Sequence, residues 1–160
     1  KKLEKLGYSD SVQNAKDHLR DIAGIRVICY FIDDIYNLVN ALKRQSELIF
    51  IREKDYIQNP KPNGYRSFHV IIAVPVYYLD TMEYFPVEIQ LRTMTMDLWA
   101  SMEHRVCYKK LPEHRDELAE AFCQYADILG KIEEQFEAYN ETGMLEEITP
   151  AQITENPTEG

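Results

Sequence analysis

The strict alternation of apolar and polar residues in Val87-Glu88-Ile89-Gln90-Leu91-Arg92 constrains the fold of this chain more than any other feature. Successive side chains of a strand point to opposite faces, so one face is apolar and the other carries Glu88, Gln90 and Arg92. Taken alone, the pattern fits an ordinary strand with one solvated face. The functional alternative is a rigid platform that presents a carboxylate, an amide and a guanidinium to a metal ion and phosphates.

The segments around this strand predict a mixed sheet covered by helices. We expect an α/β (α+β) fold with strands over 25–32, 48–52, 67–74 and 85–92, a short extension over 76–78, and helices over about 35–46, 93–109 and 113–140. Asp33 and Asp34 are candidate caps of the first helix, and Asp80 to Glu83 is a candidate turn. We divide the chain into a domain over 1–112, a C-terminal helix over 113–142 and a polar tail over 143–160.

Composition limits the classes of protein to which this chain can belong. With 45% hydrophobic residues among 160, it can bury a core, and no apolar run reaches the length of roughly 20 residues that spans a bilayer. The N-terminal residues carry no signal-peptide pattern, and three cysteines without metal-ligand spacing are typical of the cytoplasm. Residues 1–110 carry 16 basic against 14 acidic side chains, whereas 111–160 carry 2 against 13. The first part could therefore hold a phosphate-rich ligand on a local basic patch.

A second motif stands just ahead of the first predicted strand, in Arg20-Asp21-Ile22-Ala23-Gly24-Ile25-Arg26. Asp21 is a carboxylate just ahead of a predicted buried strand, Gly24 permits close backbone approach, and Arg26 is a cation among apolar residues. A capping aspartate and a salt-bridged arginine explain this motif without any ligand. The functional alternative is a metal-phosphate site built from the two carboxylates Asp21 and Glu88.

A third motif gathers cations, aromatic rings, an amide and a histidine between residues 54 and 69. Such a set can hold phosphates by charge and a nucleobase by stacking. A hairpin with a solvated basic loop is the alternative. No P-loop, dinucleotide fingerprint, metalloprotease motif or serine-centred elbow is present in the sequence. The residues alone therefore indicate an α/β domain with a candidate metal-phosphate site.

Four segments in order carry a family resemblance: DIAGIRV (21–27), KDYIQNPKPNGYRSFH (54–69), VEIQLRT (87–93) and LWASMEHRVCYK (98–109). They resemble the synthetase domain of RelA/SpoT-type alarmone synthetases, and the short chain resembles the small alarmone synthetases. The resemblance implies a nucleotidyltransferase-like fold. It also implies Mg²⁺-dependent transfer of pyrophosphate from ATP to the 3′-hydroxyl of GDP or GTP, which yields (p)ppGpp and AMP.

The resemblance also implies roles for individual residues. Asp21 and Glu88 match the acidic pair that holds Mg²⁺, and Glu88 matches the proposed general base. Arg26 matches an arginine that stacks on adenine, and Tyr65 matches the aromatic that stacks on the acceptor guanine. The other positions that line the acceptor nucleotide are Lys54, Lys61, Asn63 and His69. Two further residues support the site: Gln90 and Arg92.

Two alternatives to an active synthetase stay open at this point. One is a catalytically inactive module of the same fold that binds guanine nucleotides or RNA, although no feature of the sequence specifically indicates RNA. The other is a different nucleotidyl transferase on a related fold. The presence of both Asp21 and Glu88 favours an enzyme, because a pure binding module needs no pair of carboxylates facing phosphates.

The C-terminal helix carries an apolar seam. Its residues recur at alternating spacings of 4 and 3, typical of a heptad seam: Leu118, Phe122, Tyr125, Leu129, Ile132 and Phe136. The seam either packs on the sheet domain of its own chain or contacts another subunit. The resemblance favours the second alternative, because small alarmone synthetases are oligomers built partly through C-terminal helices.

Overall fold

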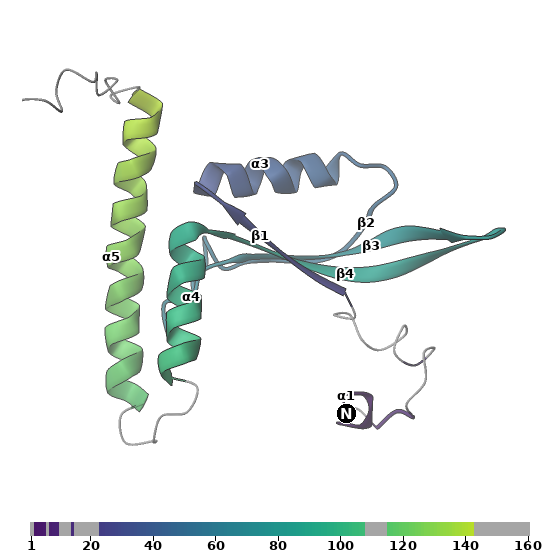
Figure 1. The fold of residues 1–160 in the computed structure, drawn as a ribbon, viewed down its shortest axis with the longest axis horizontal. Helices are drawn as coiled ribbons and strands as arrows, with labels where there is room; N and C mark the ends of the chain where they lie inside the picture. The colour runs from purple at the N-terminus through teal and green to yellow at the C-terminus, as the bar shows by residue number, and fades with distance from the viewer. Residues whose placement is uncertain (1, 6, 10–13, 15–22, 108–114, 143–160) are drawn as a thin grey trace, which may run out of the picture.

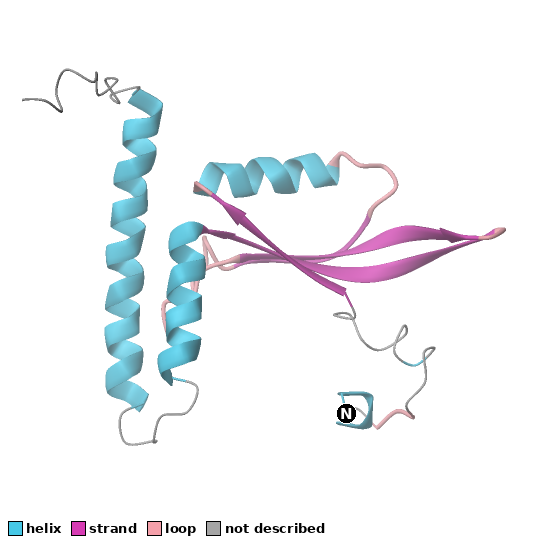
Figure 2. Cartoon of the chain, viewed as in Figure 1, coloured by secondary structure: helices cyan, strands magenta, loops and turns pink. Residues whose placement is uncertain are grey.

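A computed structural model of the chain describes residues 2–5, 7–9, 14, 23–107 and 115–142. Figure 2 shows its helices and strands: a sheet with one helix on one side and two helices at one end. In chain order the elements are α1 (Lys2–Lys5), β1 (Ala23–Cys29), α3 (Ile32–Lys43), β2 (Ile49–Asp55), β3 (Phe68–Tyr78), β4 (Thr81–Thr93), α4 (Met94–Cys107) and α5 (Arg115–Thr142). None of the helices in these described ranges is long and apolar enough to span a bilayer.

The sheet has the strand order β1-β4-β3-β2. β1 runs parallel to β4, whereas β3 is antiparallel to both of its neighbours. β3 and β4 continue past the other two strands as a two-stranded ribbon, which projects from the body in Figure 1. The parallel pairing of β1 and β4 brings the Arg26 motif beside the Glu88 strand, although more than sixty residues separate them in the sequence.

One face of the sheet packs on α3, which lies across it in Figure 1. The core there joins Val70 of β3 and Leu91 of β4, both fully buried, to Ile35 and Val39 of α3. Val87, Ile89 and Leu91 all belong to this core cluster, so the apolar half of the alternating strand lies where the pattern predicts. The predicted fold class is confirmed. Glu88, Gln90 and Arg92 belong to the opposite face.

Local boundaries differ from the prediction at the first strand and helix. β1 ends at Cys29 and is mostly exposed, because it is the edge strand and pairs only with β4. The expected buried strand over 25–32 was therefore wrong in burial and in length. α3 begins at Ile32, so Asp33 and Asp34 lie in its first turn instead of preceding it. Asp34 still satisfies the helix start, because its Oδ2 accepts a hydrogen bond from the Phe31 backbone N–H.

The β3–β4 hairpin also differs from the prediction. β3 runs without a break through Pro75 to Tyr78, and the turn is Leu79–Asp80 instead of Asp80 to Glu83. Pro75 is tolerated because pairing with β2 ends at Ala73, so the segment beyond has an unpaired edge. Leu79 takes a positive φ of 51° in this tight turn.

A second apolar cluster joins α5 to α4. Trp99 of α4 packs against Phe122, Ala126 and the partly buried Leu129 of α5, and its indole N–H donates to the Phe122 carbonyl oxygen at 2.6 Å. α5 stands beside α4 at the end of the sheet, as Figure 1 shows. The predicted seam therefore divides between two faces of the helix. Its remaining exposed members, with two further exposed apolar residues, form a second stripe: Tyr125, Ile128, Ile132, Phe136 and Tyr139.

Candidate active site

Four of the predicted site residues form one row across all four strands. Arg26 of β1 is the register partner of Gln90 of β4, and Gln90 is the partner of His69 of β3. His69 in turn is the partner of Lys54 of β2. Glu88 lies on the same face, two residues before Gln90. We call this face, which points away from α3, the site face.

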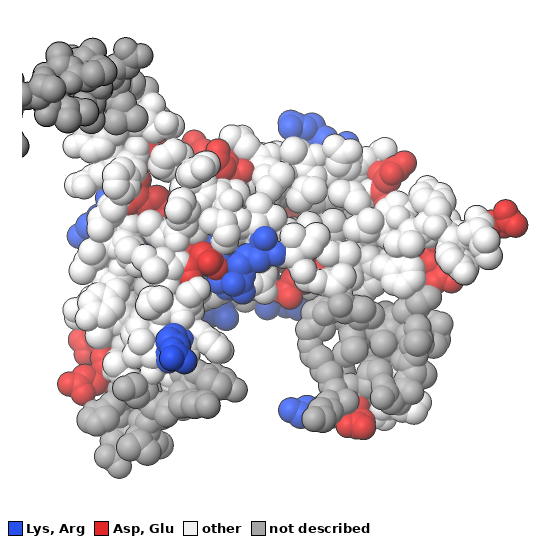
Figure 3. Space-filling view, viewed as in Figure 1, with Lys and Arg blue, Asp and Glu red and all other residues white. Residues whose placement is uncertain are grey.

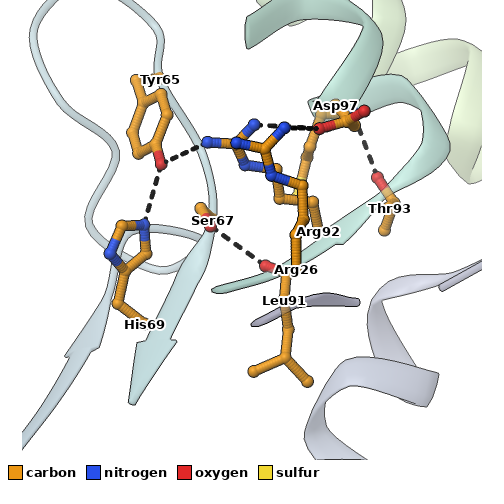
Figure 4. Close-up of polar contacts among 9 residues, drawn as sticks. Arg26, Tyr65, Ser67, His69, Leu91, Arg92, Thr93 and Asp97 are labelled. Atoms are coloured by element: carbon orange, nitrogen blue, oxygen red, sulfur yellow. Dashed lines mark hydrogen bonds and ion pairs between the residues drawn. The ribbon is translucent and has the colours of Figure 1, made fainter. Parts of the chain in front are cut away.

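A chain of hydrogen bonds runs over the site face, and Figure 4 shows its Tyr65 end. Glu88 Oε1 lies 3.2 Å from His69 Nδ1, and His69 Nε2 lies 2.8 Å from the Tyr65 hydroxyl oxygen. Arg92 Nη2 donates to that same oxygen at 2.9 Å. An ionised carboxylate only accepts, so Nδ1 carries the proton and Nε2 accepts from the tyrosine. Burial lowers the pKa of His69 and outweighs Glu88, which acts to raise it. The lowered pKa favours the neutral ring.

The 61–66 loop is a tight turn that presents Tyr65. Gly64 adopts a φ of 89°, and its N–H donates to the Lys61 carbonyl oxygen at 2.8 Å. Asn63 Oδ1 accepts from the Tyr65 backbone N–H at 3.3 Å, so this amide oxygen shapes the loop itself. Lys61 Nζ lies 4.8 Å from the centre of the Tyr65 ring. The loop thus places a cation and an aromatic ring together beside His69.

Tyr56 belongs to the same cluster, although the sequence analysis did not select it. Its ring contacts Tyr65 and His69 edge to face, with centroids 5.9 and 5.4 Å apart. The ammonium groups of Lys61 and Lys54 lie 4.9 and 5.8 Å from its centroid. Its position between the two lysines in the 54–69 motif was the available signal.

Asp97 in the first turn of α4 is the second residue that the sequence analysis missed. Its Oδ1 accepts from Arg92 Nη1 at 3.0 Å and from Arg26 Nη1 at 3.4 Å. One carboxylate therefore ties the half-exposed Arg26 of the edge strand to the buried Arg92 of β4. The free-energy cost of placing the Arg26 cation in an apolar strand is offset by the exposure of its side chain and by its ion pair with Asp97.

We expect Asp97→Asn to lower the free energy of unfolding by about 1–3 kcal/mol, because Arg92 is buried and loses its charged hydrogen-bond partner. Urea denaturation followed by circular dichroism measures the change. Asp80→Asn in the exposed hairpin turn is the matched control and is expected to change the stability by less than about 0.5 kcal/mol. Equal effects of the two substitutions would show that the Arg92–Asp97 pair contributes nothing particular.

Two adjoining hollows open at the site face. The larger, of about 570 Å³, lies between Arg26, Tyr65 and Arg92 on one side and α4 on the other. Its α4 wall consists of Ala100, Ser101, Glu103, His104 and Arg105. The second, of about 230 Å³, is lined by Gly24, Ile25, Arg26, Glu88 and Gln90. Because Arg26 lines both, two ligands bound there would be neighbours. Figure 3 shows Lys and Arg side chains gathered between α4 and the sheet.

The fit of a magnesium ion rests on Glu88 among the described residues. No group of three or more His, Cys, Asp or Glu side chains in the described ranges is arranged to hold a metal ion. Magnesium in phosphoryl-transfer sites takes one or two carboxylates and completes its coordination with substrate phosphates and water, so one partly exposed carboxylate beside cations fits it. Asp21, the second predicted ligand, lies outside the described residues.

Comparison with known proteins places this site in a family. The family model described as "Region found in RelA / SpoT proteins" matches residues 1–113. GTP pyrophosphokinase YwaC of Bacillus subtilis is 46% identical over 134 residues, which is 84% of this chain and 64% of that protein. GTP pyrophosphokinase YjbM of the same organism is 37% identical over 107 residues, 67% of this chain and 51% of that protein. The chain thus spans between half and two thirds of these relatives.

Solved structures agree with the sequence comparison. Small alarmone synthetase 2 from Bacillus subtilis matches with a TM-score of 0.75 and 43% identity, over 88% of this chain and 73% of that one. Small alarmone synthetase 1 from the same organism, bound to its product pppGpp, matches with a TM-score of 0.72 and 27% identity, over 88% and 70%. Both the family predicted from the four motifs and the nucleotidyltransferase-like fold are confirmed. This chain belongs to the RelA/SpoT family.

Proposed function

We propose that the chain transfers the β,γ-pyrophosphate of ATP to the ribose 3′-oxygen of GDP or GTP, yielding ppGpp or pppGpp and AMP. Its relatives are named GTP pyrophosphokinases, which supports this reaction class. The observation that carries the proposal is the row of Arg26, Gln90, His69 and Lys54 beside Glu88. That row joins cations suited to phosphates with a carboxylate suited to a metal ion or a proton.

The acceptor nucleotide is proposed to bind at the 61–66 loop. Tyr65 stacks on the guanine, and Lys61 and Lys54 hold the acceptor phosphates. In this structure Lys61 lies over the Tyr65 ring. Lys61 is exposed and flexible, so an incoming base takes its place and the ammonium turns to the phosphates. Asn63 and His69 complete the acceptor site toward the phosphates and the base edge.

ATP is proposed to bind on the Arg26 side, with adenine on the guanidinium that Asp97 orients. The 3′-oxygen of the acceptor attacks the β-phosphorus of ATP. The bond from that phosphorus to the α,β-bridging oxygen breaks, AMP leaves with this oxygen, and the hydroxyl proton passes to Glu88. Gln90 and Arg92 support these groups from the same strand, and Arg92 does so through Tyr65 and Asp97.

Magnesium is the cofactor that this arrangement suits, with Glu88 and Asp21 as its proposed protein ligands. When bound, it neutralises negative charge on the transferring phosphates. We also propose that the protein acts in the cytoplasm. The three cysteines, which form no disulfide in the structure, fit a reducing compartment.

Incubation of the protein with Mg²⁺, ATP and either GDP, GTP or buffer tests the proposal. Anion-exchange chromatography is expected to resolve AMP and a more highly phosphorylated guanosine nucleotide only when both substrates and the metal ion are present. Binding of GDP or GTP without any new product would favour the inactive binding module. AMP formation that does not depend on the guanine nucleotide would favour a different transferase.

The exposed stripe on α5 supports a second proposal, that the chain forms a homo-oligomer through its C-terminal helix. Five large apolar side chains recur along one face of α5 and stay exposed in the single chain, among them Ile128 and Phe136. A second copy presenting the same stripe would cover them. Phe122 and Leu129 serve the contact with Trp99 instead and are therefore not available for a subunit contact.

We expect Phe136→Glu to reduce the particle mass measured by light scattering while circular dichroism stays unchanged, because Phe136 is 61% exposed in the single chain. Ala138→Glu, an exposed position away from the stripe, is the control and is expected to keep the oligomer. Phe122→Glu is expected to disrupt the tertiary structure instead, because Phe122 is buried against Trp99. An unchanged mass for Phe136→Glu would contradict the subunit contact.

A further inference from the structure

The two residues that flank Tyr65 are both held by α5, an element outside the proposed active site. Gly64 lies flat against the helix: a Cβ atom at this position would come within 2.9 Å of Ala126 Cβ and 3.1 Å of Cys123 Cα. Real Cβ atoms essentially never come within 2.9 Å of another atom, so only glycine allows the loop backbone to approach α5 this closely. This contact fixes the loop on the side that precedes Tyr65.

Arg66 fixes the loop on the side that follows Tyr65. Its Nη2 donates to Asp127 Oδ1 at 3.2 Å, and its guanidinium crosses α5 at Gly130. A Cβ atom on Gly130 would lie 2.6 Å from Arg66 Nη1. The guanidinium therefore occupies the room that the missing side chain leaves. A glycine in the middle of a 28-residue helix is unfavourable for helix stability, so this position serves a contact at the expense of the helix.

α5 also holds the helix that carries Asp97. Glu133 is only 4% exposed, and its Oε2 accepts from the Thr93 hydroxyl at 2.7 Å and from the Thr95 hydroxyl. Thr93 directly follows Arg92 and caps α4 by accepting from the Met96 N–H at 3.3 Å. A carboxylate at the N-terminus of α4 is favoured by the helix dipole. α5 thus contacts both partners of the Tyr65–Arg92 hydrogen bond through their chain neighbours.

We propose that Gly130 and Asp127 are positioning residues for acceptor binding: they hold Arg66 on α5 and thereby fix Tyr65 where the guanine stacks. The inference rests on the proposed function for the identity of the acceptor. The Arg66–Asp127 pair is partly exposed, with side-chain exposures of 29% and 63%. Such a pair contributes little to global stability, so its value lies in the position of the loop.

Gly130→Ala separates positioning from stability. The new methyl group displaces the end of a flexible arginine side chain, and alanine favours the helix over glycine. We expect the KM for GDP or GTP to rise about 3- to 10-fold, in the range of couplings between contacting residues. The kcat and the KM for ATP are expected to equal those of the wild type. The thermal midpoint is expected to stay the same or to rise. Gln124→Ala, exposed elsewhere on α5, is the control and is expected to change none of these.

A double-mutant cycle tests whether Gly130 acts through Arg66. In an Arg66→Ala background, Gly130→Ala is expected to leave the KM for the acceptor unchanged, because no guanidinium remains to be displaced. An additive effect in that background would overturn the proposed route. Asp127→Ala, which removes the acceptor of the Arg66 hydrogen bond, serves as a second variant should Gly130→Ala lower the thermal midpoint, and it is expected to raise the acceptor KM in the same way.

Hydrogen exchange tests whether α5 fixes the 61–66 loop, and this measurement does not depend on enzymatic activity. Amides of the 61–66 loop, held by the bonds of Lys61 and Gly64 within the turn, are expected to exchange faster in nucleotide-free Gly130→Ala than in the wild type. Amides of β3 around Val70 are expected to be unchanged. If the wild type makes no alarmone but the loop still exchanges faster in the variant, the proposed function is wrong, whereas the positioning of the loop by α5 is supported. Unchanged loop exchange and an unchanged acceptor KM would overturn the inference.

Discussion

Glu88→Gln is expected to reduce synthesis of the 3′-pyrophosphorylated guanosine nucleotide by at least about 10²- to 10⁴-fold, the usual contribution of a general base. Glutamine has the same shape and still accepts a hydrogen bond from His69 Nδ1, so the fold and the hydrogen-bond chain persist. It cannot take a proton and offers no charge to a metal ion. Initial rates at saturating ATP and GDP measure the loss.

The control for this variant is Glu120→Gln, an exposed carboxamide substitution on α5. It is expected to leave the rate unchanged, and circular dichroism is expected to be identical for both variants and the wild type. A Glu88→Gln rate within about threefold of the wild type would contradict the assignment of Glu88 as base and metal ligand, because neither role survives without the charge.

Tyr65→Ala is expected to raise the dissociation constant for GDP or GTP about 5- to 150-fold, because base–aromatic stacking contributes roughly 1–3 kcal/mol per base. ATP binding is expected to change much less, since Arg26, which is proposed to receive adenine, is held by Asp97, and Asp97 is linked to Tyr65 only through Arg92. Isothermal titration calorimetry with each nucleotide measures both constants.

Tyr65→Phe divides the effect between the ring and the hydroxyl group. Phenylalanine keeps the stacking surface but loses the oxygen that joins His69 to Arg92. We expect this variant to bind the acceptor within about threefold of the wild type, because both lost hydrogen bonds join protein groups and neither is made to the nucleotide. If Phe and Ala weaken acceptor binding equally, the hydroxyl network and not the ring determines acceptor affinity.

The site face was predictable from the sequence because period 2 in β4 and the order of the motifs are local signals. The alternation assigned Glu88, Gln90 and Arg92 to one face, and the structure has them there. The row that joins Arg26 and Lys54 to the same face is not a local signal. It depends on the strand order, which puts β4 between β1 and β3, and no single segment encodes that order.

Asp97 and Tyr56 were missed because their roles come from contacts between elements. Asp97 follows Arg92 by five residues, but its second partner is Arg26, far away in the sequence. The low burial of β1 was missed for the same reason, since an apolar run does not reveal whether a strand is central or at an edge.

The apolar seam of α5 shows a further limit of periodicity. Spacings of 4 and 3 fit both the stripe that packs on Trp99 and the stripe that stays exposed, because the two lie on adjacent sides of one helix. Periodicity alone therefore predicted a single seam where the helix has two stripes. Only the position of α4 separates Phe122, which is buried, from Phe136, which is exposed.

Transfer of an isotopic label tests whether this protein moves the pyrophosphate of ATP to a guanosine nucleotide. ATP labelled with ³²P at the β-phosphate is incubated with GDP, Mg²⁺ and the protein, and the products are separated and counted. We expect the label to appear in a guanosine nucleotide at the 3′ position, in amounts equal to the unlabelled AMP released. Label found in free pyrophosphate or remaining in adenine nucleotides, with AMP formed or not, would contradict pyrophosphate transfer by this site.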